Sequence, residues 1–343
     1  MKEKFTVIQV GFGPMGQLIT ELLLKRKNVN LKGVIDIDPM FTGKNLRNFF
    51  DIEEKKNLII QSNLKTIISK GKVDCVIIAT SSSLEKITPI IIEAVQSGCN
   101  VISLCEELSY PFHYYPEISK ELDQLAKLQT VSIIGTGINP GYLMDLLPIV
   151  LTAPSQSVES IKVTRMMNSG KRRVPFQRKI GTGLTKKEFE QKIRNKDIMG
   201  HVGLIQSIQM IASALGIDYD EILEFPPEPI TSDKEFISSY GEKIPKGNVC
   251  GLKSKAVAKR ASKEIILLDF VAYAGEHEEF DSVLIEGNPN IHQKIIGGIH
   301  GDIGTAAIVV NLIPTVIKAK PGLLTMKDLP VPCNTEYIWK KKK

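Results

Sequence analysis

Three glycines near the start of the chain have the spacing of a loop that binds phosphate. The segment Gly11-Phe-Gly-Pro-Met-Gly16 follows a short apolar run, residues 5–10, and precedes a helical pattern. In such a turn Gly11 permits the tight bend, Gly13 lets the backbone approach a pyrophosphate, and Gly16 lets the helix pack on the strand. The helix N-terminus then offers free N–H groups to the phosphates. We therefore expect a dinucleotide to contact Gly11, Phe12, Gly13, Pro14, Met15 and Gly16.

An acidic residue follows at the distance that a dinucleotide site requires. Asp36 lies 20 residues after Gly16, at the end of a second predicted strand, residues 31–36. A carboxylate there accepts hydrogen bonds from the ribose hydroxyls and repels a 2′-phosphate. The next residues, 37–39, offer no arginine to such a phosphate, although Lys44 could reach it. We therefore expect NAD as the cofactor, with NADP as the alternative.

A hydroxyl-rich segment follows the third predicted strand, residues 73–80. Open α/β sheets bind their ligands outside the carboxyl ends of the strands. The segment Ala79-Thr80-Ser81-Ser82 begins at that end, so we expect these four residues to line the cofactor site. Ser82 or Ser83 is equally suited to cap the helix that comes next.

Two adjacent carboxylates, Glu106 and Glu107, follow the next predicted strand, residues 100–104. Both cannot point into one apolar pocket, so we expect one to face the cofactor while the other faces solvent or caps a helix. A carboxylate in an apolar pocket has a raised pKa and can take a proton from an ammonium group or from water. The pair therefore predicts a general base, with Glu106 preferred because it lies nearer the strand. The alternative is two surface glutamates.

Arginines in the second half of the chain could hold an anionic substrate. The planar fork of a guanidinium binds a carboxylate through two hydrogen bonds. Arg165, Arg172 and Arg173 are the candidates for this role, with Arg178 and Lys179 behind them. For the last four residues the alternative is a solvated or dimer-facing basic loop.

Three further polar residues have both a ligand-binding and a structural interpretation. Asn139, in the turn Asn-Pro-Gly, can hydrogen-bond the cofactor or the substrate, or only shape the crossover between two domains. His201, close to two glycines at a helix start, can contact substrate or cap the helix. His300 is expected to position a helix that returns to the first domain.

A parallel sheet would bring the residues of the first half together. Apolar runs of strand length alternate with helical patterns, which predicts a doubly wound Rossmann sheet. The predicted strands are residues 5–10, 31–36, 73–80, 100–104 and 131–135. The predicted helices are residues 17–25, 63–69, 83–97 and 117–128.

The pattern changes after residues 139–141 and favours an inserted α+β domain. Its predicted strands are residues 157–167, 249–258, 264–273 and 281–286, and its predicted helices are 186–192 and 202–215. Residues 172–185 and 321–332 are expected to be loops, and residues 303–317 are expected to form a buried helix. We therefore expect a dinucleotide-binding domain of residues 1–138 plus 301–343. Residues 139–300 would bind substrate and form the dimer contact.

Composition narrows the function classes. The 343 residues carry a net charge of +6, and four of the positive charges lie in the terminal lysine run. The sequence has no basic stripe interleaved with aromatic residues, so it gives no reason to expect nucleic-acid binding. It also has no run of roughly 18 apolar residues, so it predicts no membrane span. The five cysteines form no Cys-x-x-Cys pair, which indicates neither a disulfide framework nor a zinc site. We therefore expect no metal and a cytoplasmic location.

Several segments in combination resemble the 2,4-diaminopentanoate dehydrogenase family. These are Cys105-Glu-Glu-Leu-Ser-Tyr-Pro111, Gly135-Thr-Gly-Ile-Asn-Pro-Gly-Tyr-Leu-Met-Asp-Leu-Leu-Pro148, Arg172-Arg-Val-Pro-Phe-Gln-Arg-Lys-Ile-Gly-Thr-Gly-Leu184, Gly200-His-Val-Gly-Leu204 and His300-Gly-Asp-Ile-Gly-Thr-Ala-Ala307. The family includes the native amine dehydrogenases and is distantly related to dihydrodipicolinate reductase. The resemblance covers essentially the whole chain.

The resemblance implies a reaction and its context. It implies the reversible oxidative deamination of 2,4-diaminopentanoate to 2-amino-4-oxopentanoate and ammonia with NAD(P), and reductive amination of ketones in reverse. It also implies a homodimer that acts in ornithine degradation. In this family a glutamate after the serine-rich turn is the base, which corresponds here to Glu106 or Glu107.

Two other functions stay open from the sequence. One is an imine reductase similar to dihydrodipicolinate reductase, although the paired histidines of that enzyme are missing from this chain. The other is a non-catalytic NAD sensor, against which the glutamate pair and the basic loop argue.

Overall fold

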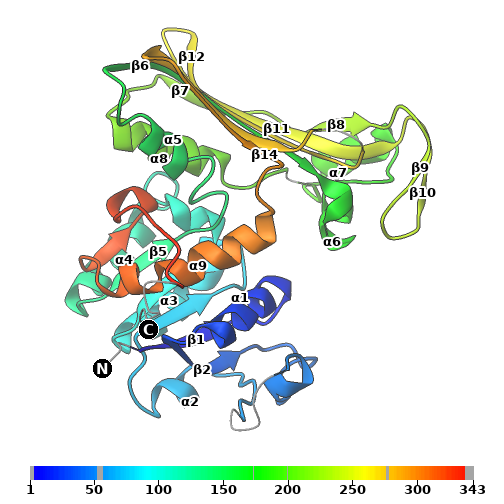
Figure 1. Cartoon of the computed structure of the whole chain (residues 1–343). Coiled ribbons are helices and arrows are strands. Elements are labelled where there is room, and N and C mark those ends of the chain that lie inside the picture. The colour runs from blue at the N-terminus through cyan, green and yellow to red at the C-terminus, as the bar shows by residue number, and fades with distance from the viewer. Residues whose placement is uncertain (1–3, 52–56, 173, 199, 276–277, 337–343) are drawn as a thin grey trace, which may run out of the picture. The chain divides into compact units, whose positions relative to one another are not determined.

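The computed structural model describes residues 4–51, 57–172, 174–198, 200–275 and 278–336. The chain folds into two compact units, which we call the first and the second unit. The first unit consists of residues 1–142 and 300–343, and the second consists of residues 143–299. Figure 1 shows the elements of both units along the chain.

A six-stranded parallel sheet forms the centre of the first unit and confirms the predicted Rossmann fold. Its strand order is β15-β5-β4-β3-β1-β2. The strands are β1 (Phe5–Val10), β2 (Val29–Ile35), β3 (Cys75–Ile78), β4 (Asn100–Ser103), β5 (Ser132–Gly135) and β15 (Gly322–Leu324). The loop predicted over 321–332 is wrong where β15 lies, because a three-residue strand carries too little pattern to be recognised before it pairs with β5.

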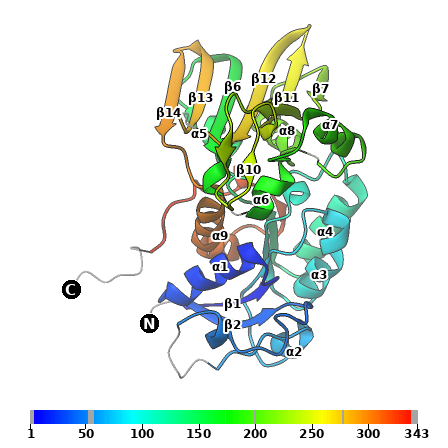
Figure 2. The same ribbon diagram turned by 90° about the vertical axis from the view of Figure 1, so that its right-hand side faces the viewer.

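Helices cover both faces of this sheet (Figure 2). Helices α1 (Pro14–Lys25) and α9 (Gly301–Ile317) pack against each other on one face, while α3 (Leu84–Gln96) and α4 (Pro116–Leu128) cover the other. A one-turn helix, α2 (Lys65–Ile68), precedes β3. Because both faces are covered, the central strands are continuously buried rather than alternating. In the described part of the chain, no helix has the length and apolar character to cross a bilayer.

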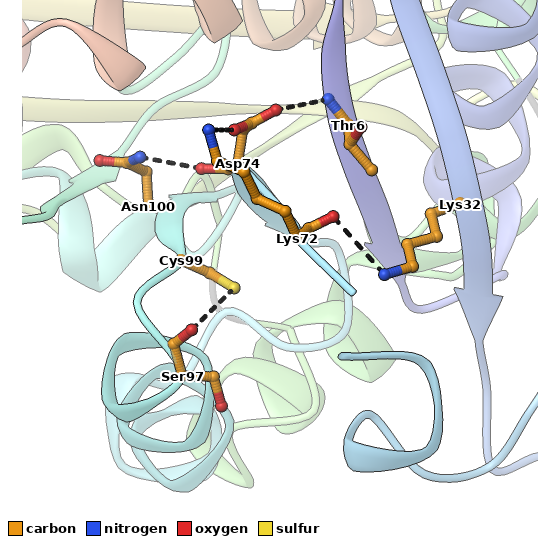
Figure 3. Close-up of polar contacts among 7 residues, drawn as sticks. All are labelled: Thr6, Lys32, Lys72, Asp74, Ser97, Cys99 and Asn100. Carbon is orange, nitrogen blue, oxygen red and sulfur yellow. Dashed lines mark hydrogen bonds and ion pairs between the residues drawn. The ribbon is translucent and has the colours of Figure 1, made fainter. Parts of the chain in front are cut away.

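At the amino ends of the strands, Asp74 connects the start of β3 to its two neighbouring strands, β1 and β4 (Figure 3). Its carboxylate accepts a hydrogen bond from the Thr6 N–H at 2.8 Å, and its own N–H donates to the Thr6 carbonyl, also at 2.8 Å. The side-chain amide of Asn100 donates to the Asp74 carbonyl at 2.8 Å. Since a slip of one residue would turn every side chain of a strand to the other face, these contacts keep β1, β3 and β4 in register.

A seven-stranded, mainly antiparallel sheet forms the second unit, in the order β14-β13-β6-β12-β11-β7, with β8 also paired to β11. The strands are β6 (Ser157–Asn168), β7 (Glu221–Glu224), β8 (Glu228–Thr231), β11 (Val249–Arg260), β12 (Lys263–Tyr273), β13 (Phe280–Asn288) and β14 (Ile291–Ile296). A small pair, β9 (Phe236–Ile237) and β10 (Lys243–Ile244), stands apart. Helices α5 (Leu146–Leu151) and α8 (Leu204–Leu215) pack together, and α8 lies against β11 and β12.

The loop predicted over 172–185 is wrong in part, because α6 (Val174–Lys179) lies within it. The buried side chain of Gln177 in this helix donates hydrogen bonds to the Arg172 carbonyl and to the Ser239 hydroxyl, both at 2.7 Å. Ser239 is 62 residues further along the chain, so this anchor is tertiary and leaves no local pattern in the sequence. The next helix, α7 (Lys186–Arg194), lies where the sequence predicts it and begins with a Thr185 capping box.

Candidate functional site

Two glycines of the first turn are required by close backbone packing. A Cβ atom on Gly11, whose φ is +90°, would lie 2.4 Å from the Ala79 carbonyl oxygen, and one on Gly16 would lie 1.9 Å from the Gly11 carbonyl oxygen. Both distances are far below van der Waals contact. Helix α1 and the end of β3 therefore approach the turn as closely as only glycine permits.

The N-terminus of α1 presents three backbone donors beside an open space. The N–H groups of Gly13, Met15 and Gly16 donate to no acceptor within the described residues. A Cβ atom on Gly13 would meet no other atom within 4 Å. Free N–H groups and the helix dipole together favour a bound anion. The turn thus fits the pyrophosphate of a dinucleotide, with Gly13 at the point of closest approach.

Asp36, directly after β2, connects this turn to the next loop. Its carboxylate accepts hydrogen bonds from the N–H of Phe12 at 2.5 Å and from the N–H of Asp38 at 2.8 Å. A carboxylate has about four acceptor sites, so Asp36 keeps acceptors for the two hydroxyls of a ribose. The half-buried Asp36 is therefore both a turn anchor and a suitable ribose ligand.

The side chain of Phe12 anchors the turn from the other side. It is fully buried and makes edge-to-face contacts with Phe41, Phe49 and Phe50, with ring centroids 5.1–5.9 Å apart. Phe12 thus serves as packing, and only its backbone remains for a cofactor contact.

The segment after β3 lies against the glycine turn. The Ala79 N–H donates to the Val10 carbonyl at 2.8 Å, and Thr80 would be 2.9 Å from a Cβ atom on Gly11. The sequence offered Ser82 or Ser83 as the cap of α3, but neither side chain caps this helix. The Ser81 hydroxyl instead accepts a hydrogen bond from the Ser83 N–H at 3.1 Å. The structure therefore joins Ala79 and Thr80 to the turn and leaves Ser82 exposed beside it.

The two adjacent glutamates have different surroundings in the short 3₁₀ helix Glu106–Ser109. Glu107 accepts a hydrogen bond from the Leu84 N–H at 2.7 Å and so caps α3. Burial and a hydrogen bond to Glu107 raise the pKa of Tyr115 to about 12. The half-buried carboxylate of Glu106 makes no hydrogen bond or ion pair with any residue that the structure describes. Glu107 is thus held in place, and Glu106 is the carboxylate available for a ligand.

Asn139 follows β5 at the same carboxyl edge of the sheet. The loop that leads to it is fixed by two hydrogen bonds, from the Thr136 N–H to the Ser103 carbonyl at 2.8 Å and from the Ile138 N–H to the Thr305 hydroxyl at 3.2 Å. Because the strands are parallel, the ends of β1, β2, β3, β4 and β5 lie along one edge. The predicted cofactor residues and both glutamates therefore gather there.

In the second unit, one row of paired residues crosses four strands. Ser254 of β11 lies opposite Phe270 of β12, Phe270 opposite Arg165 of β6, and Arg165 opposite Asp281 of β13. The Arg165 side chain is buried, and its Nε lies 3.6 Å from a carboxylate oxygen of the buried Asp281. Burial raises the pKa of Asp281, and the charge of Arg165 opposes that rise. This ion pair is the charged part of the row, which also holds the apolar Phe270 and the polar Ser254.

His201 packs on this row. Its ring stacks on Phe270 with a centroid distance of 4.2 Å and an angle of 9°. Its backbone N–H donates to the Ser254 hydroxyl at 3.1 Å. Burial and the charges of Arg165 and Lys179 lower the pKa of His201 to about 3. The ring is therefore neutral at physiological pH. It does not cap α8, whose N-cap position is Gly203.

The other predicted arginines are not part of this row of paired residues. The half-buried Arg172 places its guanidinium 4.8 Å from the centroid of the Phe176 ring. Arg178 is exposed and lies 3.6 Å from Glu242. Arg173 lies outside the described residues.

Comparisons with known proteins identify the family. Residues 142–341 match the 2,4-diaminopentanoate dehydrogenase C-terminal domain. A protein of Acetoanaerobium sticklandii named 2,4-diaminopentanoate dehydrogenase is 36% identical over 335 residues, which is 96% of this chain and 94% of that protein. The chain belongs to the 2,4-diaminopentanoate dehydrogenase family. The predicted resemblance is confirmed, and so is an NAD(P)-dependent oxidoreductase of the class that acts on CH–NH2 groups.

Solved structures agree with this fold. The amine dehydrogenase from Mycobacterium smegmatis superposes with a TM-score of 0.83 at 21% identity, covering 97% of this chain and 98% of that one. Dihydrodipicolinate reductase from Paenisporosarcina sp. TG-14 gives a TM-score of 0.53 at 14% identity, covering 94% and 98%. These likenesses show that the 2,4-diaminopentanoate dehydrogenase family shares its two-part architecture with both proteins.

Sequence reasoning missed several residues that shape the site in this family member. Gln9 is buried, and its side-chain amide donates to the carbonyls of Val10 and Gly11, both at 3.1 Å. The sequence carried a signal for this role, because a single glutamine stands inside an apolar predicted strand next to the glycines. Phe270 and Asp281 gave none, because strand pairing alone brings them to Arg165.

The two inner glycines of the turn should respond differently to substitution. Gly16→Ala should destabilise the fold by about 1–3 kcal/mol, because its methyl group overlaps a backbone carbonyl. Gly13→Ala should fold normally, since its φ of −62° suits alanine, yet weaken NADH binding by about tenfold, or 1.4 kcal/mol. Urea unfolding and NADH titration measure both effects. Normal NADH affinity in Gly13→Ala would place the pyrophosphate elsewhere.

The half-buried His201 should make stability depend on pH. Its pKa is about 3 in the folded chain against an ordinary value of 6.5, so between these values the unfolded chain binds one more proton. The free energy of unfolding should therefore fall as the pH drops through this window, by at most about 1.4 kcal/mol per pH unit. His201→Phe keeps the stacked ring but cannot titrate, so its curve should be flatter. Parallel curves from urea unfolding across the window would contradict this assignment.

Proposed function

We propose that this chain catalyses the reversible oxidative deamination of 2,4-diaminopentanoate at its 4-amino group, giving 2-amino-4-oxopentanoate and ammonia with NAD. The observation that carries the proposal is the separation of the two glutamates. Glu107 is bound to the N-terminus of α3, while the Glu106 carboxylate has no hydrogen-bond partner among the described residues, at the edge that carries the dinucleotide turn. The dehydrogenase named in the comparison supports the same substrate.

The residues of the first unit suit NAD better than NADP. The N–H groups of Gly13, Met15 and Gly16 would hold the pyrophosphate, and Asp36 would hold the adenosine ribose. Asp38 brings a second carboxylate to the same loop, and its carboxylate accepts the Met40 N–H at 2.8 Å. Two carboxylates there repel the charge of a 2′-phosphate. The nicotinamide ring, when bound, accepts the hydride from the amine-bearing carbon.

Glu106 would act as the base in two steps. The substrate amine is protonated in water, so it must lose a proton before its carbon can release a hydride. Glu106 would take this proton and release it to solvent. Loss of the hydride leaves an iminium group on the substrate, and Glu106 would then take a proton from the water that attacks it. Glu106 would return this second proton to the nitrogen of the resulting carbinolamine, so that the C–N bond breaks, the ketone forms and the nitrogen leaves with the hydroxyl proton as ammonium. A carboxylate without a fixed hydrogen-bond donor is free to alternate between the two protonation states.

Arg165 would bind the substrate carboxylate. It lies on a strand rather than a loop, and contacts with Asp281 and Ile299 fix the direction of its guanidinium. A guanidinium oriented in this way binds a carboxylate with little further loss of side-chain entropy. The neutral His201 near it carries no charge of its own. Asn139 and Arg172 remain candidates for further ligand contacts, and Arg173 is a candidate from the sequence alone.

Assembly and cellular context follow from the family resemblance. We propose a homodimer that works in the cytoplasm in ornithine degradation and that can aminate ketones in reverse. The cysteines are consistent with a reducing compartment, since all five are free and four of them are buried. Light scattering of the purified protein measures the oligomeric state.

A substrate screen tests the proposed reaction. NAD reduction should be fastest with 2,4-diaminopentanoate and about a hundredfold weaker in kcat/KM with the same amine lacking the carboxylate, a loss of about 2.7 kcal/mol. Replacing NAD by NADP should lower kcat/KM by at least about tenfold, because of the carboxylates of Asp36 and Asp38. A chain that binds NADH but reduces neither coenzyme with any diamine or simple amine would be a sensor rather than this enzyme.

Substitution of each glutamate separates the two roles. Glu106→Gln should lower kcat by at least about a hundredfold, the range of general-base catalysis, with unchanged NADH affinity. Glu107→Gln is the matched control, because its amide oxygen can still accept the Leu84 N–H and most activity should remain. The steady-state rates of NAD reduction decide between them. A reversed pattern would assign the base to Glu107.

A further inference from the structure

The ion pair of Arg165 and Asp281 binds both backbone polar groups of one residue, Ile299. Arg165 Nη2 donates to the carbonyl of Ile299, and the N–H of Ile299 donates to a carboxylate oxygen of Asp281 at 2.8 Å. Ile299 is the last residue of the second unit, and the chain continues into the first unit from His300. The charged pair therefore binds the segment through which the chain leaves the second unit.

Glycines flank Ile299 in this segment, and the N–H groups of Gly297 and Gly298 donate to the carbonyls of Glu279 and Ile295 at 2.8 and 3.2 Å. Gly297 and Gly298 precede Ile299 with φ of +80° and +62°, and Gly301 follows His300. Glycine gives a chain more conformational freedom than any other residue. Gly298 also lies close to Asp281, since a Cβ atom there would be 3.5 Å from the carboxylate. Contacts to the buried, charged Arg165 and Asp281 therefore help to fix a glycine-rich segment.

We infer that Asp281 is a positioning residue, which clamps Ile299 and orients the Arg165 guanidinium toward the substrate carboxylate. The second part of this inference rests on the proposed role of Arg165, whereas the clamp itself does not. The carboxylate faces Arg165 with one oxygen and the Ile299 N–H with the other. A single side chain thereby fixes both the exit segment and the direction of the arginine fork.

Directly after the clamp, the chain continues into α9 of the first unit. Six residues after Ile299, the Thr305 hydroxyl of α9 accepts the hydrogen bond from the Ile138 N–H. His300 occupies the N-cap position of α9.

Two variants of Asp281 separate the two parts of the inference. Asp281→Leu removes both contacts, so hydrogen exchange of the Ile299 amide should be at least about tenfold faster than in the wild type. Asp281→Asn keeps an oxygen for the Ile299 N–H but loses the charge that holds Arg165. Its exchange at Ile299 should stay near the wild-type rate, while KM for 2,4-diaminopentanoate rises about tenfold with little change in kcat. KM for the amine lacking the carboxylate should not change.

Asp269→Leu is the matched control. Asp269 is also buried in this sheet and also lies 3.6 Å from a basic side chain, that of Lys253. It precedes Phe270, so its side chain points to the other face of β12. This variant should lose stability without faster exchange at Ile299 and without a selective rise in KM.

The outcomes distinguish the clamp from the proposed function. Wild-type exchange at Ile299 in Asp281→Leu would overturn the clamp. An equal rise in KM for both substrates in Asp281→Asn would overturn the orienting role. Faster exchange in Asp281→Leu, with a wild type that shows no preference for the carboxylate-bearing substrate, would support the clamp and overturn the role proposed for Arg165.

Discussion

Helix α1 rests directly on the backbone of the glycine turn, with no side-chain atom between them at Gly16. This close approach fixes where the helix begins and therefore where its unpaired N–H groups point. The buried side-chain amide of Gln9 donates hydrogen bonds to the carbonyls of Val10 and Gly11, while the Asp36 carboxylate accepts one from the N–H of Phe12. The acceptors and donors of the turn are thus occupied except where a phosphate would lie. The rest of the cofactor site is arranged around this geometry.

The two units solve the problem of charge in different ways. At the edge of the parallel sheet, Glu107 is held by the N-terminus of α3, while the Glu106 carboxylate has no hydrogen-bond partner among the described residues. In the second unit, Arg165 and Asp281 are buried as a pair, which avoids the high cost of a single buried charge. His201 avoids the same cost by losing its proton. The charged groups of this row are therefore paired, and its histidine is neutral.

Local pattern was sufficient for most of the parallel sheet and its helices. The glycine turn, Asp36 and the central strands are short-range features, since each depends on neighbours within one βαβ unit. The helix α6 and the strand β15 were not predictable, because Ser239 and β5, which stabilise them, are distant in sequence. The sequence also named Glu106 and Glu107 without separating them. Their separation depends on the Leu84 N–H, 23 residues away, and on where α3 begins.

The first unit is assembled from both ends of the chain, while the second is one continuous segment. On the ribosome, the second unit can therefore fold as soon as residue 299 has emerged. The parallel sheet must wait longer, because its edge strand β15 and the covering helix α9 are synthesised after the second unit. Until then β3, β4 and β5 stay exposed to water on the face that α9 covers, with apolar side chains that aggregate readily. Nascent chains of this protein consequently pass through a stage in which the second unit is folded and the first unit is not.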